Sequence, residues 1–358
     1  MQTLSYVSPR AKKQKFDNFD AKDYKSLGLL GIHVSDRFIS QAMDSLQPTV
    51  TSPSMTTPIQ FMQYFLPGHV NIATAARRAD TFVGKSSEAR WEDQEIVQQV
   101  METLGYAAPY SDITNPVLSG YNVNYERRTI VRFEQALMVG YLEQLRASAA
   151  NVNADASKRT AALQSLEIER NRVAFYGFND GNGRTYGLLN DPTLPAYQTV
   201  KLGLSGSTFW STKSMLEIQS DLLTGFQNLR TNSGEVVDPK ETMITIGVAT
   251  DAVDDLSTPT QFGYSIQAWL AANYPKTRIT SAPEFNGANG GQNVFYMYAE
   301  TVDDYSTDDG LVFKQVVPAT DLFVGVEQRA KGYVEVHANA TAGVYCKRGF
   351  AVYRASGI

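Results

Sequence analysis

Apolar residues recur at the spacing of an α-helix most clearly between positions 154 and 176. They fall on one face there, which a helix in a folded protein buries. Asn153 or Asp155 can cap the first turn, and Gly177 can end the last one. At about 1.5 Å per residue, the predicted helix spans roughly 35 Å. The sequence therefore predicts one long helical rod near the middle of the chain.

Other segments also carry helical spacing, and most of the C-terminal part has the pattern of strands. The further predicted helices are 95–104, 137–145, 213–230 and 260–272. The predicted strands are 243–248, 278–280, 293–298 and 311–317, and residues 342–353 alternate as a closing strand pair with the preceding strands. With no sequence repeat and no linker between domains, this mixture indicates the α+β class.

Between residues 81 and 132 the pattern indicates a long β excursion. Tyr121 to Tyr125 alternates bulky β-forming residues with Asn at a period of two, and Arg128 to Phe133 continues as a strand. A two-stranded ribbon is marginally stable by itself in water. We therefore expect this excursion to gain stability by lying on another subunit.

The first 75 or so residues give little sign of a domain of their own. A segment rich in Ser, Thr and Pro at 47–58 neither packs nor continues a helix, and apolar residues follow at 61–66. An extended arm that needs a neighbour to bury these residues fits this pattern. A flexible tail followed by one core segment fits it equally well.

Composition and charge narrow the functional classes. The 358 residues are 43% hydrophobic and 19% charged, which is typical of a folded protein. Thirty-two Lys and Arg against 37 Asp and Glu give a net charge of −5, whereas proteins that wrap nucleic acid usually carry a basic excess. Any contact with nucleic acid should thus be local and weak. The single cysteine, Cys346, excludes an intrachain disulfide, and no apolar stretch suits a signal peptide or a membrane helix. We expect a soluble protein that is intracellular when made.

No motif for catalysis or for cofactor binding is complete. The three histidines, His33, His69 and His337, lack the spacing of metal ligands and are more typical of surface or structural residues. Gly203 to Ser207 lacks the second glycine of a nucleophile elbow. The acidic segment 303–309 could bind a divalent ion weakly, although a solvated loop is the simpler interpretation. We therefore expect no catalytic residue, cofactor or metal, and a protein with a binding or structural role.

Four segments carry a resemblance to known proteins, and they come in the expected order. They are Asn124–Glu134 (NYERRTIVRFE), Glu167–Gly177 (EIERNRVAFYG), Tyr186–Asn190 (YGLLN) and Asn286–Gly291 (NGANGG). With the arm, the β excursion, the long helix and the α+β remainder, they resemble major capsid proteins of tailed bacteriophages with the HK97 fold. More specifically, the chain is similar to a phage capsid family long catalogued as a domain of unknown function. The resemblance runs from about Thr74 to Ile358, and the arm is its least distinctive part.

The resemblance implies an α+β, HK97-type capsid fold with an N-terminal arm, an extended β-loop, a long spine helix in a peripheral domain, and an axial domain. The implied bounds are 1–79 for the arm and the start of the peripheral domain, 80–132 for the extended loop, 133–235 for the peripheral domain with its spine helix, 236–326 for the axial domain, and 327–358 for the return strands of the peripheral domain.

It also implies self-assembly into pentamers and hexamers of an icosahedral head that encloses phage dsDNA, in the bacterial host cytoplasm. A separate scaffolding protein is expected, because no counterpart of the prototype's cleaved scaffolding domain precedes the arm. A portal is expected too, with a decoration protein as an open alternative, and no membrane. Lys85 lies in the region of the prototype's crosslinking lysine, but no partner Asn matches a motif. We therefore expect no crosslinking.

Residues around the base of the β excursion are the expected contacts between subunits. They are Arg77, Arg78, Lys85, Glu88, Trp91, Glu92, Asp93, Arg127 and Arg128. A solvated surface position explains any single charge among them equally well. The basic residues Arg10, Lys12, Lys13 and Lys15 could face packaged DNA, a scaffolding protein or an acidic neighbour.

Three other functions stay open on the sequence alone. An encapsulin-like nanocompartment shell would share the fold and enclose protein in place of DNA. A soluble α+β enzyme of unknown type would have one deep polar pocket, and a tail or minor virion protein would form rings or tubes.

Overall fold

The structure is a computed structural model that describes residues 76–110, 112–113, 115, 117–149, 153–179, 181, 183–259 and 263–358. The chain divides into two units, Met1–Ala73 and Thr74–Ile358, and the account below concerns the second. The predicted arm with Arg10, Lys12, Lys13 and Lys15, and the histidines His33 and His69, lie outside the described residues.

The long predicted helix is confirmed as α6 (Ala154–Tyr176), with the predicted bounds. The side chain of Asn153 accepts a hydrogen bond from the backbone N–H of Ala156 at 3.1 Å, which caps the first turn. Gly177 ends the helix with φ at 71°, a conformation that glycine adopts without strain. Local sequence signals therefore define both ends of this helix.

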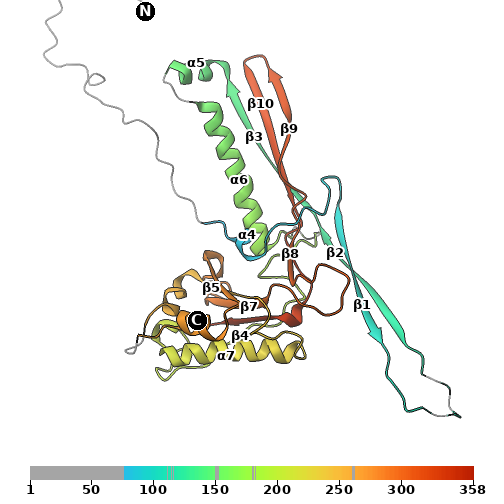
Figure 1. The fold of residues 1–358 in the computed structure, drawn as a ribbon. Coiled ribbons are helices and arrows are strands. Elements are labelled where there is room, and N and C mark those ends of the chain that lie inside the picture. The colour runs from blue at the N-terminus through green and yellow to red at the C-terminus, as the bar shows by residue number, and fades with distance from the viewer. Residues whose placement is uncertain are drawn as a thin grey trace, which may run out of the picture. The chain divides into compact units, whose positions relative to one another are not determined.

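Helix α6 lies along a three-stranded antiparallel sheet with the order β3–β10–β9 (Figure 1). These strands are β3 (Val131–Gly140), β9 (Ala319–Arg329) and β10 (Gly332–Thr341). Leu137 and Val139 of β3 pack with Ala162 of α6 in a small core. The buried side chain of Asn339 donates a hydrogen bond to the carbonyl of Leu166 at 2.8 Å, which ties β10 to the helix.

The main core surrounds a five-stranded mixed sheet with the order β4–β12–β7–β5–β6. Its strands are β4 (Gln198–Thr199), β5 (Ile244–Ala249), β6 (Thr277–Ala282), β7 (Val294–Ala299) and β12 (Val352–Ser356). Helix α7 (Met215–Asn232) packs against β7 and β12, and α8 (Ile266–Asn273) contacts α7. Every residue of β5 and β7 is buried, as expected for central strands with both faces covered.

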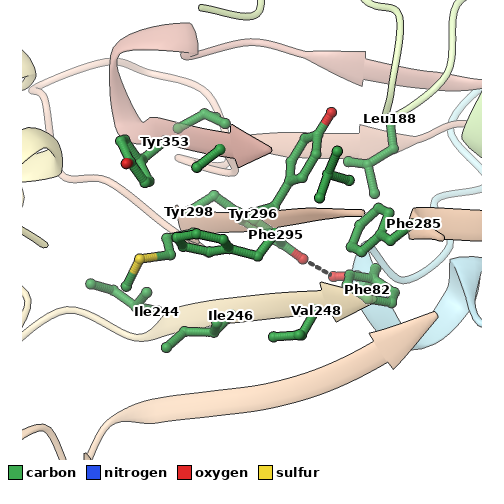
Figure 2. Close-up of a cluster of buried hydrophobic side chains, with 14 of the residues drawn as sticks. Phe82, Leu188, Ile244, Ile246, Val248, Phe285, Phe295, Tyr296, Tyr298 and Tyr353 are labelled. Atoms are coloured by element: carbon green, nitrogen blue, oxygen red, sulfur yellow. Dashed lines mark hydrogen bonds between the residues drawn. The ribbon is translucent and has the colours of Figure 1, made fainter. Parts of the chain in front are cut away.

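Aromatic rings fill much of this core, as Figure 2 shows. Phe82, from the short helix α4 (Ala79–Phe82), meets the ring of Phe285 edge-on. The hydroxyl of Tyr298 donates a hydrogen bond to the carbonyl of Phe82 at 2.7 Å (Figure 2). The rings of Phe82 and Phe285 also crowd Gly247 of β5, where an added Cβ atom would come within 2.6 Å of each of these two rings.

The remaining elements are shorter or lie outside these two sheets. They are β1 (Glu95–Leu104), β2 (Gly120–Thr129), α5 (Tyr141–Ala149), β8 (Phe313–Gln315), β11 (Val344–Cys346) and the 3₁₀ turns η2 (Trp210–Thr212), η3 (Thr250–Ala252), η4 (Asp254–Leu256), η5 (Pro283–Phe285) and η6 (Gly349–Ala351). Among the described helices, none is long and apolar enough to cross a membrane.

Two helix predictions were wrong, and two need new bounds. Residues 95–104 form strand β1, and 137–145 form the end of β3 and the start of α5. The helix predicted at 213–230 is α7, at 215–232, and the one at 260–272 contains α8, which begins only at 266. The predicted strands exist, and the closing segment pairs as expected with earlier strands: β11 with β8, and β12 with β7.

The five-stranded sheet draws on segments from both sides of the predicted axial domain, 236–326. Strand β4 and helix α7 precede this range, and β12 follows it. Strand β9, which begins inside the range, belongs to the other sheet. The domain bounds thus stay a prediction.

Candidate functional site

The β excursion is an antiparallel hairpin in which β1 and β2 pair only with each other among the described strands. The register runs from Glu95 opposite Thr129 to Leu104 opposite Gly120. Side chains directly opposite in such a pair lie on the same face of the ribbon. The register therefore decides which apolar residues gather on one face.

One face of the hairpin carries apolar residues on both strands, among polar ones such as Gln99 and Thr103. Met101 lies opposite Val123, and Tyr121 and Tyr125 flank Val123 at a spacing of two, with Val97 further along β1. We call these five residues the apolar ribbon face. Four of them are exposed and Val123 is half-buried. The opposite face carries Val100 and Leu104 on β1 but mainly polar residues on β2.

The base of the hairpin is anchored in the rest of the chain. Ile130 is buried with Val316, Ala340 and Ala342, and the half-buried Trp91 and Ile96 pack against them. Arg132 donates hydrogen bonds to the carbonyl of Trp91, at 3.0 and 2.6 Å, and its guanidinium lies 5.4 Å from the indole centroid. The hairpin thus has a fixed base and an exposed outer part.

Arg128 is an anchor inside the chain and not an exposed contact. Its side chain is 5% exposed and lies 3.3 Å from a carboxylate oxygen of Asp191 and 3.2 Å from one of Glu126. The guanidinium also stacks near the rings of Tyr186 and Tyr345, with the centroids at 5.1 and 4.6 Å. The predicted contact between subunits is therefore not available at this residue in the protomer.

Most of the other predicted contact residues already have partners within the chain. Two ion pairs join segments that lie far apart in the sequence: Arg77 with Glu167 at 3.2 Å, and Glu88 with Lys314 at 2.6 Å. A third joins Lys85 to Asp80 of α4 at 3.2 Å. Asp93 accepts a hydrogen bond from the backbone N–H of Arg90, and Trp91 packs at the hairpin base.

Six of the predicted residues are exposed, and three of these, Arg78, Glu92 and Arg127, form no close ion pair among the contacts described here. Arg78 is exposed beside α4. Glu92 and Arg127 form only loose ion pairs at the surface, with Arg90 at 3.9 Å and with Glu95 at 3.7 Å. Such pairs contribute little to stability, so these charges can change partners at low cost.

The acidic segment 303–309 is largely exposed, as expected of a solvated loop, and ion pairs hold it to the rest of the chain. The buried guanidinium of Arg348 donates hydrogen bonds to Asp304 at 2.7 and 3.0 Å and to Asp308 at 3.1 and 2.6 Å. Lys347 binds Asp308 and Asp309, and Lys314 joins Asp309 to Glu88. Hydrogen bonds from Arg348 lower the pKa of Asp304 to about 2. Among the described residues, no cluster of His, Cys, Asp or Glu could hold a metal ion.

A second cluster of charged side chains connects α6 to the edge of the three-stranded sheet. Arg159 of α6 donates two hydrogen bonds to Glu335, at 2.8 and 2.7 Å. Glu335 lies 2.8 Å from Nε2 of the buried His337, and Nδ1 of that ring lies 2.9 Å from Asp321 of β9. Burial by itself lowers the pKa of His337, but the hydrogen bonds to Asp321 and Glu335 outweigh it and raise the pKa above 6.5. His337 is thus a structural residue, as the sequence suggested.

Sequence reasoning missed both charged clusters, because their partners lie far apart along the chain. Arg348 stands 40 and 44 residues from its two aspartates, and Arg159 stands 176 residues from Glu335. No local motif marks such pairs.

Comparison with known proteins gives a consistent result. A family model described as the Pa193 gp26 major capsid protein matches residues 48–357, well over half of the chain. Among solved structures, the capsid of Myoviridae phage XM1 matches with a TM-score of 0.69 and 13% identity, over 85% of this chain and 100% of that chain. No curated protein matches.

Two further solved structures match at lower similarity. The capsid of a native GTA particle has a TM-score of 0.55 and 8% identity, over 86% of this chain and 99% of that chain. Mycobacterium phage Ogopogo has a TM-score of 0.52 and 10% identity, over 85% and 99%. At these identities the likeness shows a common fold, the HK97-type capsid fold.

Proposed function

Because this chain belongs to the Pa193 gp26 major capsid protein family, we propose that it assembles by laying the apolar ribbon face of the β1–β2 hairpin on a neighbouring copy. The protein is a major capsid protein of a tailed phage, a component of the icosahedral capsid of the virion and not an enzyme. Pentamers and hexamers are the oligomers that we propose.

The main support for this contact is the exposure of the apolar ribbon face. A hairpin of two strands is marginal by itself in water, and this one pairs with no third described strand. Burying apolar surface contributes about 25 cal/mol per Å², so a neighbour that covers Met101, Tyr121 and Tyr125 would stabilise both the hairpin and the contact. Many such weak contacts in a closed shell add up through avidity.

The exposed charges near the hairpin base are proposed as secondary contacts. Arg78, Glu92 and Arg127 can reach a neighbour without breaking a strong pair. The partners of Arg77, Lys85, Glu88, Trp91 and Asp93 within the chain make these residues weaker candidates, and Arg128 is left out because it is buried.

The other partners are proposed from the resemblance to HK97-type capsid proteins. They are a separate scaffolding protein, a portal, a decoration protein and packaged dsDNA, with Arg10, Lys12, Lys13 and Lys15 facing the DNA or the scaffold. The net charge of −5 supports weak contact with DNA, without sequence specificity. The family description also favours a phage capsid over a nanocompartment shell.

The test compares the two faces of the hairpin. In one variant Met101→Ser, Tyr121→Ser and Tyr125→Ser are combined, which removes the three largest side chains of the apolar ribbon face. The matched control combines Val100→Ser and Leu104→Ser on the opposite face. All five side chains are exposed, so both protomers should fold normally.

We expect electron microscopy, with a scaffolding protein supplied, to show shells for the wild type and the control and few or none for the triple variant. Circular dichroism should show equal folding. Full shells from the triple variant would refute the proposed hairpin contact. A wild-type protein that stays monomeric under every condition would refute assembly itself.

A further inference from the structure

His337 lies between two carboxylates of the three-stranded sheet. The ring is buried; its Nε2 lies 2.8 Å from a carboxylate oxygen of Glu335 on the same strand, β10, and its Nδ1 lies 2.9 Å from one of Asp321 on the neighbouring strand, β9. A neutral imidazole has one N–H donor and one acceptor nitrogen, whereas an imidazolium donates from both nitrogens. An ionised carboxylate only accepts, so only the imidazolium satisfies both contacts.

The two carboxylates differ in what else holds them. Glu335 is buried and also accepts two hydrogen bonds from Arg159 of α6, at 2.8 and 2.7 Å. The side chain of Asp321 is 45% exposed. A neutral His337 therefore keeps its hydrogen bond to Glu335, which water does not reach, and presents a lone pair to Asp321, which can turn to water. Loss of the proton thus separates β9 from the cluster and leaves α6 and β10 joined.

The other groups around the ring leave this balance to the two carboxylates. On β3, the residue opposite His337 is the uncharged Gln135. Besides Arg159, α6 contributes Asp155, to which the hydroxyl of Tyr333 donates a hydrogen bond at 3.2 Å. Burial lowers the pKa of His337, and the hydrogen bonds and charges of the two carboxylates raise it by more, to a value above 6.5. The ring is therefore mainly a cation at pH 6.5 and becomes neutral as the pH rises further.

The backbone ladder between β9 and β10 is irregular beside this cluster. Ala319 pairs with Ala340 and Leu322 with Ala338, so two residues of β9, one of them Asp321, lie opposite a single residue of β10. Such a bulge disrupts the ladder of backbone hydrogen bonds. From this end the two strands continue into β8 and β11, which pair with each other. The side chain of Asp321 thus ties β9 to the sheet at a point where the backbone ladder is interrupted.

We propose that His337 is a pH-sensitive latch, which as a cation holds the beginning of β9 on β10 and α6 and as a neutral imidazole releases it. The latch is closed at pH 6.5 and opens as the pH rises through the pKa of His337 in the folded protein. Opening frees residues 319–322, through which the chain passes from β8 into the three-stranded sheet. All these contacts lie within one protomer, so the latch works with or without assembly.

Hydrogen exchange of the unassembled full-length protomer, followed by mass spectrometry from about pH 6 to 9, measures this opening. The protection of a segment is its exchange rate in the unfolded chain divided by that in the folded chain at the same pH, which removes the intrinsic effect of pH. The fully buried strand β5 is the reference for unfolding of the whole protomer. In parallel, NMR of isotope-labelled histidine follows the ring of His337. The chain has three histidines, and the signal that is missing in His337→Gln identifies this one.

We expect the protection of residues 319–324 to fall by about tenfold as the ring loses its proton, the factor that one charge-assisted hydrogen bond contributes, while β5 stays protected. Both His337→Gln and Asp321→Asn should remove this dependence on pH, since each leaves the pair with at most one charge. Asp321→Asn should also lower the pKa of His337 in the NMR titration. The matched control, Glu327→Gln, breaks an exposed pair with Arg329 at the other end of β9 and should keep the wild-type profile.

Constant protection of residues 319–324 across the titration of the ring would overturn the latch. A tenfold fall that persists in Asp321→Asn would overturn it as well. The side chain of Asp321 is half-exposed, so this variant should fold normally even if His337→Gln does not.

Discussion

Replacing Arg348 with methionine tests whether the ion pairs around 303–309 hold the fold together. The side chain of Arg348 is 5% exposed. Besides its four hydrogen bonds to Asp304 and Asp308, it donates one to the carbonyl of Leu311 at 3.0 Å. Methionine keeps most of the length and the apolar stem and removes all five bonds. The two aspartates would then face each other without their main counter-charge.

The expected cost can be worked out in two ways. Removing one partner from a buried ion pair typically costs about 3–5 kcal/mol, against about 0–1 kcal/mol for a surface pair. The fall in the pKa of Asp304 from 3.8 to about 2 corresponds to roughly 2 kcal/mol for that carboxylate alone, since a tenfold change in an equilibrium is about 1.4 kcal/mol. Both aspartates remain partly exposed, which weakens the interaction. We therefore expect a loss of about 3 kcal/mol.

Urea unfolding of the unassembled protomer at pH 7 measures this loss. Arg329→Met is the matched control, because Arg329 forms an exposed pair with Glu327 at 3.1 Å and should cost less than about 1 kcal/mol. If Arg348→Met lowers the free energy of unfolding no more than Arg329→Met does, the network contributes no more than a surface pair. The structural interpretation of the loop would then be wrong.

The same variant has a pH signature. Because the pKa of Asp304 is lowered in the folded state, its stabilisation is fully present above pH 3.8 and is lost as the pH falls through about 2. The wild type should lose stability over that interval more steeply than Arg348→Met. Equal slopes would exclude Arg348 as the cause of the lowered pKa.

Two further predictions concern stability. The raised pKa of His337 means that its stabilisation is fully present below pH 6.5 and is lost as the pH rises through the higher folded value. Glutamine at position 337 carries no positive charge for Asp321 and Glu335. In His337→Gln, the free energy of unfolding in urea should therefore no longer fall as the pH rises through this range. A profile equal to that of the wild type would contradict the role of His337 as a cation. Gly247→Ala should lower the free energy of unfolding by about 1–3 kcal/mol, because a Cβ atom there meets two phenylalanine rings. Gly325→Ala, which has open space around the added atom, is the control in thermal melting, and equal melting temperatures would refute the crowding.

The sequence predicted α6 and the central strands well because the information that specifies them is local. The buried face of α6 meets β3 and β10 of the same chain, and Asn153 and Gly177 define its ends. Strand β5 carries Ile244, Ile246 and Val248 at a period of two and β-branched residues at most positions, which favours a strand. In each case the partner that covers the apolar residues belongs to the chain itself.

The two wrong helix predictions have one physical cause. In β1, apolar residues at 96, 97, 100, 101 and 104 match helical spacing, because only Ile96 is covered, at the hairpin base, and beyond it neither face of the strand is covered within the chain and the period of two is lost. At 137–145 the apolar stripe is real, but its first part packs in strand β3 and its last part stays exposed on α5. Prediction of helices and strands from the spacing of apolar residues assumes that the chain covers its own apolar faces. Both segments include large apolar side chains that this chain leaves exposed, such as Met101 of β1 and Leu145 of α5, and a subunit that joins other copies in a shell requires such surfaces.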